Sequence, residues 1–430
     1  MRRILFTLAI SLFAAPLLAQ TSLLPTLEKI RPEYPTPMSP QQLGELLNRV
    51  AWQHRAEGWG LLDKPGGNRC PTPGGHDISC DILFHKPSTH HFDVLIDSGG
   101  AAIPNWLDDG PMDLARWVPP EAIAEPPELP RLSGPGDELL IGFGSSGLWG
   151  MFDGNAYARI HAAKVKNMAA GDMDGSGIDE VVTDFGAAGI WAWVNNSYWL
   201  QLTQGSADQL LVADFTGDGR AEVIATFPGQ GIWAWYAYSW IQVHPLNPTR
   251  LAVGNLDGIG GADLIADFPG QGIWVYYNIA QWRQIQTLNS TAIVTGHFDG
   301  DARDEVVISF PGAGVWTYAN NTVWGQVHPL TASRLAVGNI DGTGVDDLVM
   351  DFPGYGLWTL RNAAVWKPLH ASSAENILLS DLDGNGKDEI VIDFGNKGLW
   401  AFANDQFWTQ LHTANPDVLT AGPLNAPRVR

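Results

Sequence analysis

The stretch DLDGNGKDE, from Asp381 to Glu389, places oxygen-bearing side chains at alternate positions of a glycine-containing loop. With Asp381 as position 1, these side chains stand at positions 1, 3, 5 and 9, and position 7 can offer its backbone carbonyl. Such a loop suits a hard cation that takes about six to eight oxygen ligands, and glycine permits the tight curl. We therefore predict calcium, because magnesium keeps several of its waters and zinc prefers Cys and His.

Related loops recur along the chain, and their oxygen content differs. We predict three complete calcium loops and a fourth with fewer carboxylates: Asp172, Asp174, Ser176, Ile178 and Glu180; Asp214, Thr216, Asp218, Arg220 and Glu222; Asp381, Asp383, Asn385, Lys387 and Glu389; and the weaker Asn339, Asp341, Thr343, Val345 and Asp347. The loop from Asn255 has Ile259 and Gly261 at positions 5 and 7, so we expect no ion there. The loop from His297 and the one near Pro423 also depart from the pattern. The alternative for all of them is a plain Asp/Gly turn between strands.

These loops belong to a repeat that must position them. The segment F-x-x-x-G-[ILV]-W recurs at intervals of 41 or 42 residues, beginning at Phe143, Phe185, Phe227, Phe268, Phe310, Phe352 and Phe394. One unit splits into four short β-prone runs, at 335–338, 347–352, 357–360 and 365–369. Four strands in about 42 residues are typical of a β-propeller blade. We predict a mainly β fold, a seven-bladed β-propeller of four-stranded blades.

The two ends of the repeat array predict how the ring closes. The unit that begins with ELLIGFGSSGLW lacks a first strand, whereas DVLTAGPLNAP near the C-terminus resembles a first strand with nothing after it. The C-terminal strand is therefore expected to complete the first blade. Closure of this kind removes exposed sheet edges that would otherwise invite aggregation.

The repeat resembles the FG-GAP/VCBS repeats of integrin α-subunits and of a secreted fungal lectin. The resemblance rests on the D-x-[DN]-x-[DN]-G-x-x-[DE]-like loop, the DFG or DFPG segment after it and the repeat length, and it covers about 290 residues. It implies propeller blades whose loops bind calcium, and it identifies no ligand.

Two series of tryptophans follow the same period. We expect the first series to pack between blades: Trp149, Trp191, Trp233, Trp274, Trp316, Trp358 and Trp400. The second series is the candidate ligand-binding set, with core packing as its alternative: Trp199, Trp240, Trp282, Trp324, Trp366 and Trp408. Tryptophan faces stack on sugar rings, and a ring of weak sites would gain avidity on a repetitive glycan.

The chain before the repeats predicts three further segments. Residues 1–19 have the two arginines and short apolar stretch of a signal peptide, so we expect a secreted protein, extracellular or periplasmic. Residues 20–118 suggest a small α+β domain, with a helix capped by Ser39 and a hairpin around PSTH. Cys70 and Cys80 are the only cysteines, which favours a disulfide in an exported protein. The proline-rich residues 119–136 indicate a linker, and residues 137–430 the propeller.

Histidines of the first domain supply the rival hypothesis of an enzyme. His54, His76, Asp77, His85, His90, His91 and Asp93 could ligate a metal or supply a general base. No HExxH, GxSxG or P-loop motif accompanies them, and exposed histidines at strand ends explain them as well. We therefore assign no catalytic residue.

Charge and composition narrow the class of partner. The net charge of −21 disfavours nucleic acid and anionic lipid, and no long apolar stretch follows residue 19. We expect a monomeric, calcium-binding platform for glycan or a cell-surface protein, lectin-like or adhesion-like. The alternatives are a polymer-processing enzyme with a substrate-binding propeller, and a purely structural surface or matrix protein.

Overall fold

The computed structural model describes residues 40–57, 59–62, 69–71, 77–79, 84–86, 91–93, 117–118, 122–123, 136–154 and 156–424. The chain divides into two compact units, residues 1–32 with 38–128, and residues 33–37 with 129–430. The predicted signal peptide, Cys80 and nearly all of the predicted linker lie outside the described residues, so export and the disulfide stay predictions. Within the described ranges, no helix is long and apolar enough to cross a bilayer.

The first unit contains one α-helix and short strands. Helix α2 (Pro40–His54) buries Leu43, Leu46, Leu47 and Val50, which form one apolar stripe, and η2 (Arg55–Glu57) follows it directly. The strands are β1 (Gly60–Leu62), β2 (Arg69–Pro71), β3 (Asp77–Ser79), β4 (Phe84–Lys86), β5 (His91–Asp93) and β6 (Trp117–Val118). They pair in the orders β5-β4-β1-β6 and β2-β3, and the antiparallel β4–β5 pair is the predicted hairpin.

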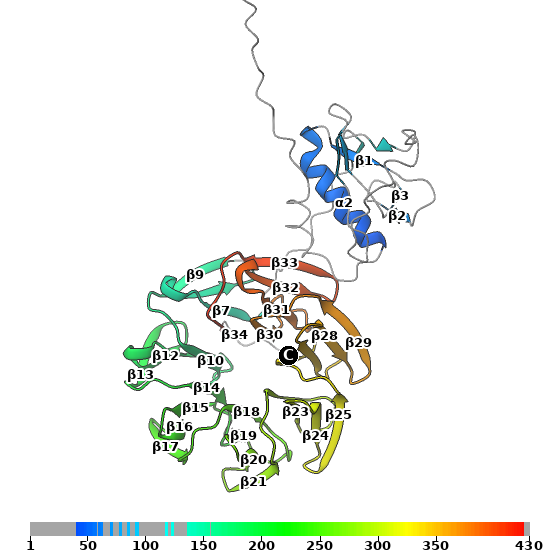
Figure 1. The fold of residues 1–430 in the computed structure, drawn as a ribbon. Coiled ribbons are helices and arrows are strands. Elements are labelled where there is room, and N and C mark those ends of the chain that lie inside the picture. The colour runs from blue at the N-terminus through cyan, green and yellow to red at the C-terminus, as the bar shows by residue number, and fades with distance from the viewer. Residues whose placement is uncertain are drawn as a thin grey trace, which may run out of the picture. The chain divides into compact units, whose positions relative to one another are not determined.

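The second unit is the predicted seven-bladed propeller, whose blades follow one another around a ring in Figure 1. Six blades are each made of four consecutive strands: β10 (Asn167–Gly171), β11 (Glu180–Asp184), β12 (Ile190–Val194) and β13 (Tyr198–Thr203); β14 (Gln209–Ala213), β15 (Glu222–Phe227), β16 (Gly231–Tyr236) and β17 (Ser239–His244); β18 (Arg250–Gly254), β19 (Asp263–Phe268), β20 (Gly272–Tyr277) and β21 (Gln281–Gln286); β22 (Ala292–Gly296), β23 (Glu305–Phe310), β24 (Gly314–Ala319) and β25 (Val323–His328); β26 (Arg334–Gly338), β27 (Asp347–Phe352), β28 (Gly356–Arg361) and β29 (Val365–His370); β30 (Asn376–Ser380), β31 (Glu389–Asp393), β32 (Leu399–Ala403) and β33 (Phe407–His412).

The remaining blade joins the two ends of the propeller, as predicted. Its order is β34 (Val418–Gly422), β7 (Glu138–Gly142), β8 (Leu148–Phe152) and β9 (Ala156–His161). Strand β34 pairs antiparallel with β7 from Val418 opposite Gly142 to Gly422 opposite Glu138. The closing blade is therefore held by a hydrogen-bonded strand pair with no chain connection between its first two strands.

The core lies between neighbouring blades. One cluster joins Val182, Ile190 and Leu202 of the β10–β13 blade to Leu210 and Val223 of the next blade, and related clusters follow around the ring. Strands such as β11, β15 and β19 are buried along their whole length, because both faces pack against other blades. The loops at the strand ends are therefore anchored by fully buried strands.

The first tryptophan series fixes the turn between the second and third strands of each blade. In every blade the indole Nε1 donates to the carbonyl three residues earlier, for example Trp191 to Ala188 at 2.8 Å and Trp358 to Tyr355 at 3.2 Å. This hydrogen bond accounts for a tryptophan at this position of each repeat.

Candidate metal centres and an adjoining pocket

The predicted calcium loops connect the first and second strands of their blades, and hydrogen bonds within each loop set its curl. In the Asp172 loop (172–180), Asp172 Oδ1 accepts the N–H groups of Gly175 at 2.7 Å and Ser176 at 3.0 Å. Glu180 Oε2 accepts the N–H of Met173 at 2.9 Å. The degraded loop from Asn255 shows the same turn, with Asn255 Oδ1 accepting the N–H of Gly258 at 2.8 Å. The turn therefore forms whatever the ligand set, and the carboxylates distinguish the loops.

Two of the three loops predicted as complete bring their carboxylates together. Oxygens of Asp172, Asp174 and Glu180 lie within 4.8 Å of one another, and so do those of the corresponding residues in the Asp381 loop (381–389). Glycines at φ +78° and +81° in the first loop and +73° and +85° in the second provide the left-handed backbone that this curl requires. Three converging carboxylates are a donor set that suits a hard divalent cation.

The surroundings of Glu389 favour a nearby positive charge. Its side chain is fully buried, and Oε2 accepts the N–H of Leu382 at 2.9 Å, while Oε1 has no hydrogen-bond partner. Burial, reinforced by the charge of Asp383, raises the pKa of Glu389 to about 8. Burial similarly raises the pKa of Glu180 to about 7. A buried carboxylate with an unsatisfied oxygen is costly, and a cation bound beside it would offset that cost.

The Asp214 loop (214–222) differs from these two. Position 3 is Thr216, whose hydroxyl donates to Glu222 Oε1 at 3.2 Å, while Oε2 of Glu222 accepts the N–H groups of Phe215 and Thr216. Asp218 accepts the N–H of Arg220 at 3.0 Å. Within the described chain, its carboxylates are not gathered as those of the Asp172 and Asp381 loops are, and this separates it from them.

In the weaker Asn339 loop (339–347), a protein cation already lies near the position 9 carboxylate. Nε of the nearly buried Arg361 lies 4.0 Å from Asp347 Oδ2, and its Nη2 donates to Asp405 at 3.0 Å. Thr343 donates to Asn362 Oδ1 at 3.0 Å. A guanidinium beside Asp347 supplies positive charge that an ion would otherwise bring. The contribution of the position 7 carbonyls of Ile178, Arg220, Val345 and Lys387 stays a prediction.

A set of asparagines that the sequence analysis did not single out contacts these loops. Asn195, between β12 and β13, donates from Nδ2 to Asp174 Oδ2 at 2.9 Å, and Asn404 donates to Asp383 Oδ2 at 3.2 Å. Hydrogen bonds from Asn195 and then Ser176 lower the pKa of Asp174. The sequence signal was an Asn that stands 23 residues after position 1 in five repeats. Its positive φ explains the choice of residue, because Asn tolerates this conformation.

Backbone hydrogen bonds join the six inter-strand loops and the two ends of the propeller into a ring. The N–H at position 8 of each loop donates to the carbonyl at position 1 of the preceding loop, at 2.6–2.9 Å. At the closing blade, Asp137 N–H donates to the carbonyl of Asp381, and Asp179 N–H donates to the carbonyl of Pro423. The two loops that gather three carboxylates therefore flank the blade in which the ring closes.

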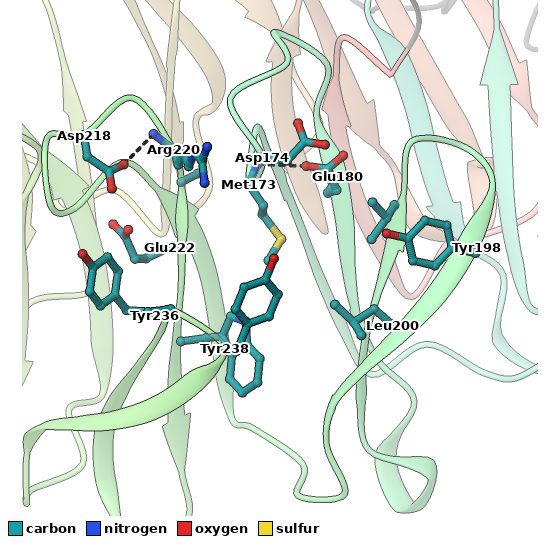
Figure 2. A pocket seen from close by; sticks show the side chains of 14 residues that line it. Met173, Asp174, Glu180, Tyr198, Leu200, Asp218, Arg220, Glu222, Tyr236 and Tyr238 are labelled. Atoms are coloured by element: carbon teal, nitrogen blue, oxygen red, sulfur yellow. Dashed lines mark hydrogen bonds between the residues drawn. The ribbon is translucent and has the colours of Figure 1, made fainter.

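A pocket of about 490 Å³ opens between the β10–β13 and β14–β17 blades, beside the Asp172 loop. Figure 2 shows Asp174 and Glu180 on one side of it, and Asp218, Arg220 and Glu222 on the other. Three exposed tyrosines line it, namely Tyr198, Tyr236 and Tyr238 with exposed fractions of 55%, 41% and 85%. The repeat pattern does not predict this pocket, because its tyrosines interrupt the repeat instead of following it.

The second tryptophan series packs mainly between strands and blades. Trp408 is fully buried, and the others are half-buried. Trp199 lies 5.4 Å from both Phe185 and His161, measured between ring centroids. Trp366 lines an apolar pocket of about 280 Å³ with Phe352 of its own blade and His328 of the neighbouring blade. Core packing therefore explains much of this series, and ligand contact by it stays a prediction.

The structure does not bring the candidate histidines of the first unit into a described site. His54 ends helix α2, and the β4–β5 register places His85 opposite Phe92 and His91 opposite Lys86. His76 and His90 lie outside the described residues, as do the side chains of His85 and His91.

Comparison with known proteins yields similarity in fold. No family model matches the chain, and no curated protein matches its sequence. The structure resembles BBS1N from a mercury-soaked complex with ARL6DN (TM-score 0.45, 11% identity, 66% of this chain and 94% of that chain). For the lead-soaked crystal of that complex the TM-score is 0.36 and the identity is 12%. The match covers 46% of this chain and 66% of that chain, just under two thirds of it. The WD40 β-propeller domain of Doa1 matches with a TM-score of 0.40 and 11% identity, over 64% of this chain and 90% of that chain.

Proposed function

We propose that this protein is a secreted, calcium-stabilised β-propeller of the FG-GAP/VCBS type that serves as a binding platform for glycans. The observation that carries the calcium site is the unpartnered, buried Oε1 of Glu389 beside the carboxylates of Asp381 and Asp383. These three side chains, with Asn385, would hold one ion, and the Asp172 loop would hold a second. When bound, calcium supplies the positive charge that this set of oxygen donors favours.

The position of these loops suggests what calcium does for the fold. Both loops are hydrogen-bonded to the ends of the propeller, at Asp137 and Pro423. Strand β34 is held in the ring by its pairing with β7 and by its packing, and the hydrogen bond from Asp179 to Pro423 follows directly after it. Ions that fix the two flanking loops would therefore stabilise the closing blade. Chelation of calcium from the full chain should lower its Tm, and an unchanged Tm would contradict a structural calcium role.

The pocket of Figure 2 supports the glycan-binding part of the proposal. Exposed tyrosine faces can stack on the C–H faces of a sugar ring, while Asp218 and Arg220 offer acceptors and donors for its hydroxyl groups. Asp218 and Glu222, which belong to neither proposed ion site, outnumber the one guanidinium of the pocket, so an uncharged sugar fits it better than an acidic one. Propellers are common binding platforms, and glycan is one class of partner for such a surface.

A glycan array probed with the full chain would test this function. Tyr198→Ala and Tyr238→Ala should each weaken binding about tenfold, since loss of one aromatic contact costs about 0.5–1.5 kcal/mol beyond its buried area. Tyr355→Ala is the matched control, because Tyr355 has a similar exposure of 64% and lies at the apolar pocket with Trp366. If only the control variant loses binding, the site lies at that second pocket. Binding of no glycan, together with capture of a defined cell-surface protein, would favour adhesion.

A further inference from the structure

A second pocket, on the ring of inner strands, has a different chemistry. It has a volume of about 250 Å³ and is lined by the beginnings of β14, β18, β22, β26 and β30, which are the innermost strands of five successive blades. The first residues of these strands are Gln209, Arg250, Ala292, Arg334 and Asn376. In blade order this is amide, guanidinium, methyl, guanidinium and amide, an arrangement that is symmetric about Ala292.

These polar side chains have a structural task that does not need a guanidinium. Gln209 Nε2 donates to the carbonyl of Pro248 in the next blade at 3.2 Å. Arg250 Nη1 donates to the corresponding carbonyl of Ser290 at 2.8 Å, and Arg334 Nε donates to the carbonyl of Glu375, which stands one position later in its repeat, at 2.8 Å. An amide makes this link between blades in one repeat, so the arginines carry additional N–H donors and a positive charge.

The positive charge of each arginine is only partly neutralised by a buried aspartate. Asp267 Oδ2 lies 3.9 Å from Arg250 Nη1, and Asp351 Oδ2 lies 3.9 Å from Arg334 Nη1, which is too long for a hydrogen bond. Asp267 already accepts the N–H and hydroxyl of Ser290. Both arginine side chains are 40% exposed and line the pocket. Their free donors are therefore available to a ligand.

We propose that this pocket binds a small oxyanion, a phosphate or a carboxylate, between Arg250 and Arg334. Guanidinium groups recognise both anions through charge-assisted hydrogen bonds. Ala292 leaves open the space that a long side chain would fill, and Gln209 and Asn376 flank it with amide groups. The pocket volume suits a small molecule instead of a macromolecule. In a protein of net charge −21, such a site would select the anion through these directed contacts.

Calorimetric titration of the full chain with inorganic phosphate and, separately, with succinate would test the site. Arg250→Gln and Arg334→Gln each introduce the residue type found at position 209, so the link between blades is kept. Each variant should lose about tenfold in affinity for the anion that binds, in line with the loss of a charged hydrogen bond. Ala292→Met should also abolish binding by filling the space while leaving the charge unchanged.

Arg283→Gln is the charge-matched control, since Arg283 lies on the outer strand β21 and its Nη2 donates to Asn321. It should bind like the parent. Binding of phosphate alone or succinate alone would identify the anion class. The proposal fails if the parent binds neither probe saturably, or if the two pocket arginine variants and Arg283→Gln lose affinity equally. A Tm within about 2 °C of the parent would show that each variant is folded.

Discussion

Replacing Asp383 with Ala should remove one bound calcium ion and lower the stability of the propeller. Oxygens of Asp383, Asp381 and Glu389 lie within 4.8 Å of one another, so the change deletes a central ligand. An ion that binds only the folded loop adds RT ln(1 + [L]/Kd), about 2.7 kcal/mol at a hundredfold excess over Kd. At about 2–4 °C per kcal/mol for a unit of this size, the Tm in calcium should fall by about 5–10 °C.

Asp257→Ala supplies a matched control for this experiment. Asp257 holds the same loop position and accepts the same two hydrogen bonds, from Ile259 N–H at 2.9 Å and Asn278 Nδ2 at 2.7 Å. Asp383 accepts its equivalents from Asn385 and Asn404. Both variants therefore lose the same turn contacts, and only Asp383→Ala should change the response to calcium.

The assay combines calcium titration by calorimetry with thermal unfolding in calcium and in chelator. Hydrogen exchange over residues 418–422 adds a local measurement, because the carbonyl of Asp381 accepts the N–H of Asp137 next to the closing blade. Calcium should slow this exchange in the parent and in Asp257→Ala more than in Asp383→Ala. Equal calcium stoichiometry in Asp383→Ala and the parent would refute the assignment of the Asp381 loop.

Two further predictions concern the fold. Deleting the chain from Asp417 onward should destabilise the propeller by more than about 4 kcal/mol, because it removes β34 from the closing blade. Deleting residues 20–118 should leave the Tm of the propeller nearly unchanged. Thermal unfolding of both truncated proteins checks this prediction. Burial lowers the pKa of His328, whose Nδ1 accepts the N–H of Leu330 at 3.2 Å. The unfolded chain then takes up protons near pH 6.5 before the folded one does, so His328 makes stability fall as the pH drops below about 6.5. His328→Gln, which copies Gln286 at the corresponding strand end, should lessen the loss of Tm between pH 7 and pH 5, and an identical loss in both proteins would contradict this role.

Much of the fold could be predicted because its information is local. The period of 41 or 42 residues, the DFG or DFPG segment and the alternating carboxylates set the strands and the turns, and the strands predicted for the Arg334 unit match β26 to β29 within one residue at each end. The missing first strand before Leu139 and the extra strand at Val418 predicted the closing pair. The apolar stripe of α2 is equally local, since residues three and four apart share a helix face.

The sites were only partly predictable, because their members come from different blades. Loop spacing identified Asp214 as an equal of Asp172, but the carboxylates of its loop do not converge, and the hydroxyl of Thr216 donates to Glu222. Spacing also gave no sign that Arg361 would lie beside Asp347. Such contacts depend on where side chains point in three dimensions, which the repeat pattern does not encode.

The sequence by itself determined seven blades, their strand order and the loops that carry carboxylates, since strand alternation and glycine turns act over a few residues. Only the tertiary structure decided which residues of different repeats meet. Tyr198 and Tyr238 form one pocket, and Arg250 and Arg334 share another although 84 residues separate them. The physical reason is ring closure: it sets inner strands side by side around an axis and places each loop against its neighbour, so that distance along the chain no longer measures distance in space.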